Sequence, residues 1–336
     1  MSDEKSESPF TVGLFVPEDA PYIRDLFLAV YGDQYPVRTY YDPKALAESC
    51  ARREIIIMSA RDPQGRVIGM TAIFRNSPYE NIYESGSGLV FPEYRNYGIT
   101  TRLMSRLFFE PEGLKGLPVE GIWGEAVANH DGIQKLIGRL GFVETGIEVD
   151  LMPSSAYDKE KSASGRVGSV VGFKTVKPSS HTVFLPRVYD AELRFLYEGL
   201  DDKRALESAT EALPDVKTEF AKQVFDFASV ARIFINRSGR DFEAAFDGFE
   251  KKLATENRLE IIQVWVRLAE PWNLEIVEAL RKRGYFMGGL FPRWYDNDGF
   301  MLNKIMGRPN WEGLVLHTDR AKKIRDFIYA DWEKTR

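Results

Sequence analysis

The stretch from Gly86 to Leu107, GSGLVFPEYRNYGITTRLMSRL, constrains the fold more than any other part of this chain. It predicts a strand that ends at Pro92, a short turn that contains Gly98, and a helix that begins directly after the turn. The first N–H groups of a helix have no acceptor within it, and together with the helix dipole they bind anions. Because glycine has no side chain, Gly98 leaves room for a ligand at these donors. The stretch therefore predicts a phosphate-binding strand, turn and helix.

Short strands and amphipathic helices surround this unit in the first half of the chain. Apolar residues recur at three- and four-residue spacing in the helices, and turn residues separate the apolar strands. Strands are predicted over 10–16, 54–61, 65–75, 79–91, 121–127 and 142–151, and helices over 19–31, 42–50, 99–109 and 129–140. The predicted order is β, α, α, β, β, β, α, β, α, β, which indicates a mixed α and β fold.

The second half of the chain also mixes strands and helices. The segment from Pro153 to Gly168 is small, polar and charged, which is typical of an exposed linker. Beyond it, strands are predicted over 169–175, 182–185, 228–235, 259–268 and 285–290, and helices over 189–200, 242–253 and 273–283. The predicted organisation is a disordered tail over 1–9, a domain over 10–153, a linker over 154–168 and a second domain over 169–336.

The second half repeats a pattern of the first. In both, a strand precedes a helix with an Asn at its start and a Gly-aromatic pair after its end: Asn129 with Gly141-Phe142, and Asn273 with Gly284-Tyr285. The turn that would correspond to Gly98 has Gly239 only two residues after Arg237. We therefore expect two related domains with one phosphate site, the second domain serving as a wall of the acceptor cleft or as a partner surface.

Composition excludes several classes of function. Lys and Arg number 45 against 50 Asp and Glu, a formal charge of -5, which argues against a nucleic-acid-binding protein. A single cysteine, Cys50, and three separated histidines predict no metal site. The start, MSDEKSESP, lacks the features of a secretory signal, and no apolar run reaches the ~20 residues that cross a bilayer. We expect a cytoplasmic protein with no nucleic-acid or membrane partner.

The turn reads Arg95-Asn96-Tyr97-Gly98-Ile99-Thr100, which resembles the Gln/Arg-x-x-Gly-x-Gly/Ala signature of the GNAT acyltransferase superfamily. The resemblance extends over residues 10–152, through the order of the elements and the Arg-Leu-Gly-Phe sequence at 139–142. It implies an α/β (α+β) fold with two GNAT-like domains, each a mixed, mostly antiparallel sheet flanked by helices. It also implies that the amides of the turn hold the diphosphate of acetyl-CoA or another acyl-CoA. Thr100 departs from the signature, which has Gly or Ala there.

The same resemblance gives binding roles to four more residues. The backbone of Leu89, Val90 and Phe91 would pair with the pantetheine arm of coenzyme A, and Asn129 would hydrogen-bond to that arm. The amide of Val90 or Phe91 would also polarise the thioester carbonyl. Because Asn is a favoured helix N-cap, a capping role is the alternative for Asn129.

Acyl transfer to an amine requires a group that accepts the amine's proton. Glu84 resembles in position the glutamate that histone-acetylating members of the superfamily use as base, and Glu125 lies on a neighbouring predicted strand. Many relatives place a Tyr five residues before the Phe of the Gly-Phe pair as the acid toward the thiolate, but this chain has Ile137 there. The nearby groups that could take its place are Tyr83, Tyr94, Tyr97 and His130.

We therefore predict an N-acyltransferase that moves an acetyl or other acyl group from acyl-CoA to a primary amine, by direct attack in a ternary complex. Ile137 and Thr100 favour an alternative, a noncatalytic acyl-CoA sensor or regulatory module. Acceptor specificity varies with loops that carry no motif, so small amines, amino acids, antibiotics and protein lysines or N-termini all stay open. The sequence is also compatible with a homo-oligomer.

Overall fold

The computed structural model describes residues 10–33, 35, 37–110, 113–154 and 165–336 of the chain. Contacts between residues divide it into two compact units, Met1–Ile122 and Trp123–Arg336. The predicted tail over 1–9 and most of the predicted linker over 154–168 lie outside the described residues. The predicted domain bounds therefore stay a prediction.

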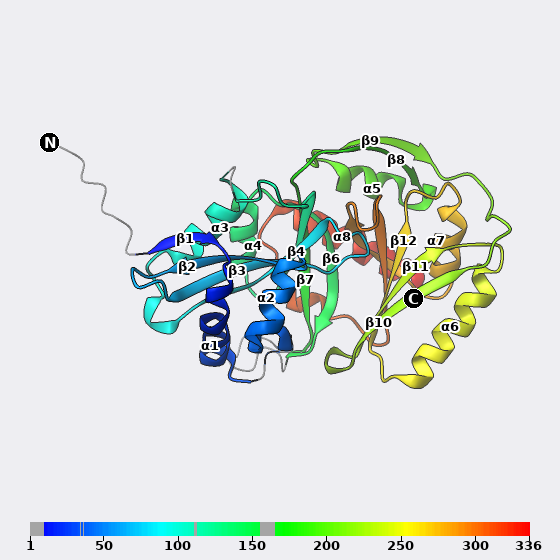
Figure 1. Cartoon of the computed structure of the whole chain (residues 1–336). Helices are drawn as coiled ribbons and strands as arrows, with labels where there is room; N and C mark the ends of the chain where they lie inside the picture. The colour runs from blue at the N-terminus through cyan, green and yellow to red at the C-terminus, as the bar shows by residue number, and fades with distance from the viewer. Residues whose placement is uncertain (1–9, 34, 36, 111–112, 155–164) are drawn as a thin grey trace. The chain divides into compact units, whose positions relative to one another are not determined.

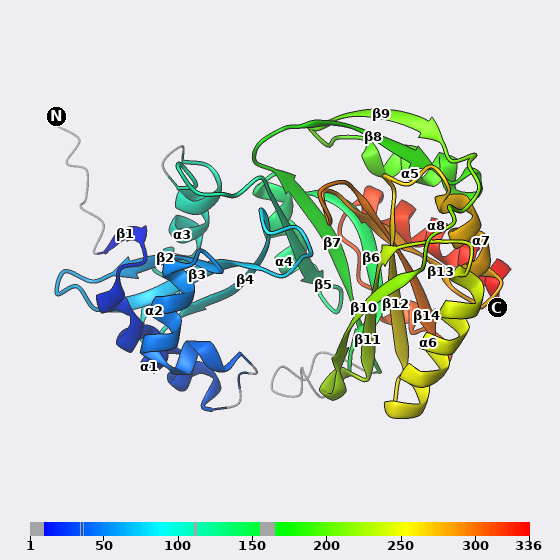
Figure 2. The same ribbon diagram turned by 45° about the vertical axis from the view of Figure 1, so that its right-hand side comes forward.

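The first unit contains a sheet whose strands pair in chain order (Figures 1 and 2). Strand β1 pairs with β2, β2 with β3 and β3 with β4, all antiparallel. The strands are β1 (Thr11–Leu14), β2 (Ile55–Arg61), β3 (Val67–Arg75) and β4 (Ile82–Val90), and the helices are α1 (Ala20–Tyr31), α2 (Pro43–Ala51) and α3 (Ile99–Phe108). This topology brings the end of β4 and the start of α3 to one turn.

The helices of the first unit cover opposite faces of this sheet, as the alternation of residues along β3 shows. Met70 and Ala72 are buried with Phe27 of α1 and Leu46 of α2. Thr71, on the other face, contacts Met104 of α3. Figure 1 shows α3 on one side of the sheet and α1 and α2 on the other.

Strand β4 carries a β-bulge at Ser87 and Gly88, shortly before it ends at Val90. Ser87 and Gly88 stand opposite the single residue Thr71, because the register passes from Met70 with Leu89 to Ala72 with Gly86. Ser87 adopts a left-handed φ of 53° at this point. A bulge redirects a side chain and increases the local twist, so it changes the course of β4 just before the phosphate turn.

The second unit contains strands in the order β5, β7, β6, β13, β14, β12, β11, β10, with a separate pair, β8 and β9. The strands are β5 (Gly121–Val127), which begins at the unit boundary, β6 (Val143–Met152), β7 (Val167–Thr175), β8 (Ser180–Leu185), β9 (Lys203–Ser208), β10 (Glu219–Phe225), β11 (Val230–Arg237), β12 (Ile261–Arg267), β13 (Phe286–Phe291) and β14 (Gly299–Ile305). The helices are α4 (Gly132–Arg139), α5 (Asp190–Tyr197), α6 (Phe242–Glu256), α7 (Asn273–Arg281) and α8 (Asp319–Thr335). The pairs β8 with β9 and β11 with β12 are parallel.

The predicted repeat appears in the strand order of this unit. In the first copy β7 lies between β5 and β6, and in the second copy β14 lies between β12 and β13. The two copies meet where β6 pairs with β13 at Gly146 and Gly289. A Cβ on Gly289 would lie 2.3 Å from the Cα of Gly146, so this approach of two backbones requires glycine.

The strand pairs of the two units are mostly antiparallel, with parallel pairs such as β11 with β12 among them, which confirms the predicted fold class. The order of strands and helices predicted through residue 151 is also confirmed. The sequence reading missed four elements of the second half, β9, β10, β14 and α8. In the described part of the chain, no helix is long and apolar enough to span a membrane.

Candidate active site

The turn between β4 and α3 has the conformation that the sequence predicts. A single 3-10 turn over Pro92–Tyr94 follows the strand. Asn96 and Gly98 then both adopt left-handed backbone angles, with φ of 71° and 74°. Helix α3 begins at Ile99, and its first backbone bond runs from the amide of Arg102 to the carbonyl of Gly98.

Six consecutive backbone amides in this turn are available to a ligand. Among the residues that the structure describes, none accepts a hydrogen bond from the amides of Asn96 through Thr101. A Cβ on Gly98 would meet no atom within 4 Å, so the turn is open in front of these donors. The turn borders a hollow of about 340 Å³, lined by Val90, Tyr94, Arg95, Asn96, Gly98, Ile99, Thr100 and Thr101. This donor set at a helix N-terminus fits a diphosphate.

The last residues of β4 differ in the backbone groups they offer. The amide of Phe91 donates to the carbonyl of Ile68 at 3.1 Å, and the carbonyl of Phe91 accepts from Tyr94. Because the direction of backbone groups alternates along a strand, Leu89 also faces β3 and Val90 faces away from it. Of the two amides considered for the thioester carbonyl, that of Phe91 already has an acceptor, which leaves Val90.

Glu84 lies on the face of the sheet that α1 and α2 cover. It stands opposite Phe74 in the register of β3 and β4, and its Oε2 accepts a hydrogen bond from Asn76 at 2.5 Å. Burial raises the pKa of Tyr35 and of Tyr40, and the negative charge of Glu84 acts on both in the same direction. A half-buried carboxylate thus lies on the sheet face against which Tyr35 and Tyr40 pack.

A pocket of about 210 Å³ opens on this same face. Its walls come from the connection between α1 and α2, from α2, and from β2, β3 and β4: Tyr35, Val37, Thr39, Tyr40, Ser49, Glu54, Ile55, Phe74, Arg75 and Ser87. Phe74 is both a wall of the pocket and the cross-strand neighbour of Glu84. The sequence reading named none of these pocket residues.

Glu125 and Asn129, the other predicted site residues, belong to the second unit. Arg232 Nη2 lies 3.1 Å from Glu125 Oε1 and 2.9 Å from Glu148 Oε1, and Glu148 also accepts from Gln263. Glu148 is fully buried, and its pKa lies well above the usual range because of burial and the charge of Glu125. Glu125 therefore belongs to a buried charge cluster, whose other members sequence reasoning missed.

Asn129 does not cap a helix, contrary to the alternative drawn from sequence. Helix α4 begins at Gly132, and its N-cap is Asp131. The amide of Gly132 donates to His130 Nδ1 at 3.2 Å, so this ring nitrogen already accepts a hydrogen bond within the connection before the helix. The helix starts late because two residues, His130 and Asp131, form the turn.

Three of the groups named in place of the usual tyrosine acid lie in the first unit. The hydroxyl of Tyr83 donates to the carbonyl of Arg53 at 2.7 Å, and its ring is fully buried. Tyr94 lines the hollow at the phosphate turn, whereas Tyr97 is 62% exposed.

Burial raises the pKa of Cys50 to about 12, so its thiol is protonated at neutral pH.

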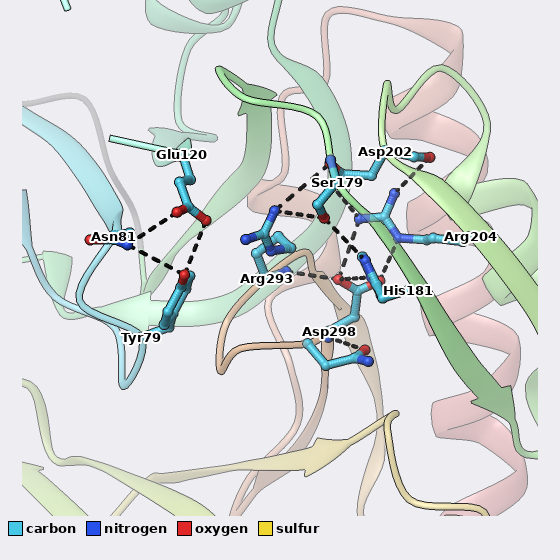
Figure 3. Close-up of polar contacts among 10 residues, drawn as sticks. Tyr79, Asn81, Glu120, Ser179, His181, Asp202, Arg204, Arg293 and Asp298 are labelled. Carbon is cyan, nitrogen blue, oxygen red and sulfur yellow. Dashed lines mark hydrogen bonds and ion pairs between the residues drawn. The ribbon is translucent and has the colours of Figure 1, made fainter. Parts of the chain in front are cut away.

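Figure 3 shows two further polar clusters, one in each unit. In the first unit, Asn81 and Tyr79 donate to the two oxygens of Glu120, each at 3.1 Å. In the second, the fully buried Asp298 accepts from Arg204 at 2.6 Å and lies 3.3 Å from His181 Nε2. Burial acts to raise the pKa of Asp298, but His181 and Arg204 outweigh it and hold the pKa far below its usual range.

The first half of the chain combines the order of elements described above, a bulge in β4 and an open turn before α3. This half of the chain has a GNAT-type fold. No protein-family model matches the chain, and no curated protein matches it in sequence. The solved structures to which the chain is similar include acetyltransferases.

Three of these structures illustrate the likeness. They are the ribosomal-protein-S18-alanine N-acetyltransferase of Escherichia coli (17% identity, TM-score 0.37), a putative acetyltransferase of Acinetobacter baylyi (19%, 0.39) and an N-acetyltransferase of Staphylococcus aureus (18%, 0.39). Each comparison covers 50% of this chain and 94%, 93% and 99% of the respective other chain. The fold assignment rests on the topology and the turn described above.

Proposed function

We propose that this chain is an N-acyltransferase that transfers the acetyl group of acetyl-CoA to a primary amine. The observation that supports this most is the open turn at Gly98, where six consecutive amides have no acceptor among the described residues. A doubly charged diphosphate satisfies such donors, and each hydrogen bond to a charged group contributes about 1.5–3 kcal/mol. When bound, acetyl-CoA supplies an activated thioester.

The proposed role of Glu84 is to take the proton of the attacking amine, directly or through a water molecule. The motivation is its half-buried carboxylate on the face that carries the aromatic pocket, where Asn76 fixes its orientation. The amide of Val90, which faces away from β3, is the proposed donor to the thioester oxygen.

In the proposed reaction the amine nitrogen attacks the thioester carbon. The N–C bond forms, the C–S bond breaks, the amine proton passes to Glu84, and coenzyme A leaves as a thiolate that takes its proton from solvent. Solvent is the proposed proton source because Ile137 stands at the usual tyrosine position and the Tyr83 hydroxyl is already bonded to Arg53. Binding both substrates side by side supplies much of the acceleration.

The test is release of free thiol from acetyl-CoA with a panel of primary amines, for wild type, Glu84→Gln and Glu80→Gln. Glu80 is the matched control because its side chain is 71% exposed on the connection before β4. We expect Glu84→Gln to lower kcat about 10²- to 10⁴-fold and Glu80→Gln to retain activity. Equal activity of both variants would contradict the role of Glu84.

The alternative is a noncatalytic acyl-CoA sensor. It is favoured by Ile137 at the usual tyrosine position and by the Tyr83 hydroxyl, which already donates to the carbonyl of Arg53. It predicts tight binding of acetyl-CoA without thiol release for any amine. The same panel, combined with calorimetric titration of acetyl-CoA, therefore separates the enzyme from the sensor.

A further inference from the structure

A second pocket of the first unit, of about 190 Å³, lies beside the start of β2. One face of α2, with Ala47, Cys50 and Ala51, forms a wall together with the end of β1 and the first residues of β2. Of the described residues that line this pocket, only Arg53 is charged, and the others are apolar. The pocket therefore combines an apolar interior with one cation.

The pocket forms where β1 leaves the edge of β2. The last backbone bond between the two chain segments runs from the amide of Phe15 to the carbonyl of Ile57, at 2.9 Å. Pro17 then starts a 3-10 turn, so the chain turns away from the sheet. The first residue of β2, Ile55, has no strand beside it on this edge in the described part of the chain, and the small side chains of α2 leave the space open.

Arg53 occupies a backbone position that glycine usually takes. It follows the end of α2 with a left-handed φ of 60°. Its amide bonds to the carbonyl of Cys50 at 3.1 Å, and the amide of Glu54 bonds to the carbonyl of Ser49 at 3.0 Å. These are the two bonds of a Schellman motif, whose left-handed residue is most often glycine. A long side chain at this angle costs conformational energy, which points to a role for the guanidinium in the pocket wall.

The charge of Arg53 is not compensated within the protein. Its guanidinium forms no ion pair with a residue that the structure describes. The carboxylate next to it in sequence, Glu54, accepts two hydrogen bonds from Arg52, at 2.8 and 3.0 Å. Asp19, which lies on the connection before α1, accepts from Arg61 at 2.8 Å. The neighbouring acids are thus already paired, and Arg53 is available to an anion.

The size and the chemistry of the pocket define one class of ligand. Burial raises the pKa of Cys50, and the positive charge of Arg53 acts in the opposite direction on this thiol of the pocket wall. An apolar cavity of about 150 Å³ holds a six-carbon molecule such as benzene, so this pocket suits a chain of about six carbons. A guanidinium binds a carboxylate through charge-assisted hydrogen bonds.

We propose that this pocket binds a small monocarboxylate, whose short apolar chain lies against α2 and β2 and whose carboxylate pairs with Arg53. The site is separate from the phosphate turn. Val90 at that turn stands in one row with Gly69 and Ala60, and Ile55 lies at the other end of β2, roughly 17 Å from Ala60 along the strand.

Hexanoate, hexanol and hexylamine are the probes, because they share one chain and differ in the charge of the head group. In calorimetric titration, wild type should bind hexanoate about 10- to 150-fold more tightly than hexanol, the effect of one charged hydrogen bond, and hexylamine most weakly. Arg53→Gly should remove the advantage of hexanoate. Ser229→Gly replaces another left-handed residue, with φ of 54°, outside the pocket, and should keep that advantage.

Urea unfolding distinguishes a lost ligand contact from a misfolded variant. The midpoint of Arg53→Gly should not fall, because glycine adopts the left-handed angle without strain. Ala47→Leu fills the pocket and leaves Arg53 in place, so it should weaken hexanoate and hexanol alike.

Three results would overturn the proposal: no hexanoate binding at millimolar concentration, hexylamine binding as tight as that of hexanoate, or hexanoate affinity that survives in Arg53→Gly. A lower unfolding midpoint of Arg53→Gly would also contradict it, because Arg53 would then be required by the fold itself.

Titration of hexanoate with coenzyme A present separates this site from the proposed acyl-CoA site. The Kd of hexanoate should not change, whether or not the protein releases thiol from acetyl-CoA. Competition between hexanoate and coenzyme A would place the carboxylate at the phosphate turn and contradict the proposal.

Discussion

Replacement of Gly98 by alanine tests the phosphate turn against a matched position in the same unit. Gly98 and Gly65 have φ of 74° and 82°, and a Cβ at either would meet no atom within 4 Å. Both substitutions place an alanine in the left-handed region, which costs roughly 1–2 kcal/mol of folding free energy. Only Gly98 borders the six available amides, because Gly65 lies in the turn between β2 and β3.

The two variants should therefore lose similar stability but differ in coenzyme A affinity. A methyl group at Gly98 keeps a diphosphate from the nearest amides, and the loss of one such charged hydrogen bond, about 1.5–3 kcal/mol, raises the Kd about 10- to 150-fold. Urea unfolding measures the stability, and calorimetric titration with coenzyme A measures the affinity. If Gly98→Ala binds coenzyme A as tightly as Gly65→Ala, the reasoning about this turn is refuted.

Three further predictions concern buried groups of the second unit. Because the pKa of Glu148 is raised in the folded state, wild type should lose stability as pH rises above about 4.5, the pKa of the unfolded state. Glu148→Gln should remove this loss, and urea-unfolding free energies that change with pH in parallel for both proteins would contradict the prediction. Asp298→Asn should destabilise at pH 7 by about 3–5 kcal/mol, a difference that should shrink below about pH 4 because the folded pKa is lowered; thermal unfolding against pH tests it. Gly289→Ala should destabilise by at least ~1–3 kcal/mol through contact with Gly146, whereas Gly248→Ala in α6 should not, and equal denaturation midpoints would refute this.

Sequence patterns predicted the first half of the fold because its signals are local. Turn residues such as Asp62 to Gly65 mark the hairpin of β2 and β3, and Gly98 marks the start of α3. The repeat was also readable, because Asn273 and Gly284 recur at nearly the spacing of Asn129 and Gly141. What the sequence could not give was the strand order that places Gly146 against Gly289.

The pocket and the charge cluster escaped prediction because they depend on distant residues. Tyr40 and Phe74 come from different elements and meet only through the packing of the α1 and α2 connection on the sheet. Glu148 has the sequence pattern of a solvent-facing strand residue, yet both faces of β6 are buried, and Arg232 and Gln263 supply its partners. Such partnerships require tertiary contacts that periodicity does not encode.

The most direct measurement of the central claim is the NMR response of the backbone amides to coenzyme A. In a deuterated, ¹⁵N-labelled sample, the account predicts that the signals of Asn96 through Thr101 shift on titration, as donors do when they gain a charged acceptor. The account would be contradicted if these six signals stayed in place at saturating coenzyme A while amides elsewhere in the protein responded.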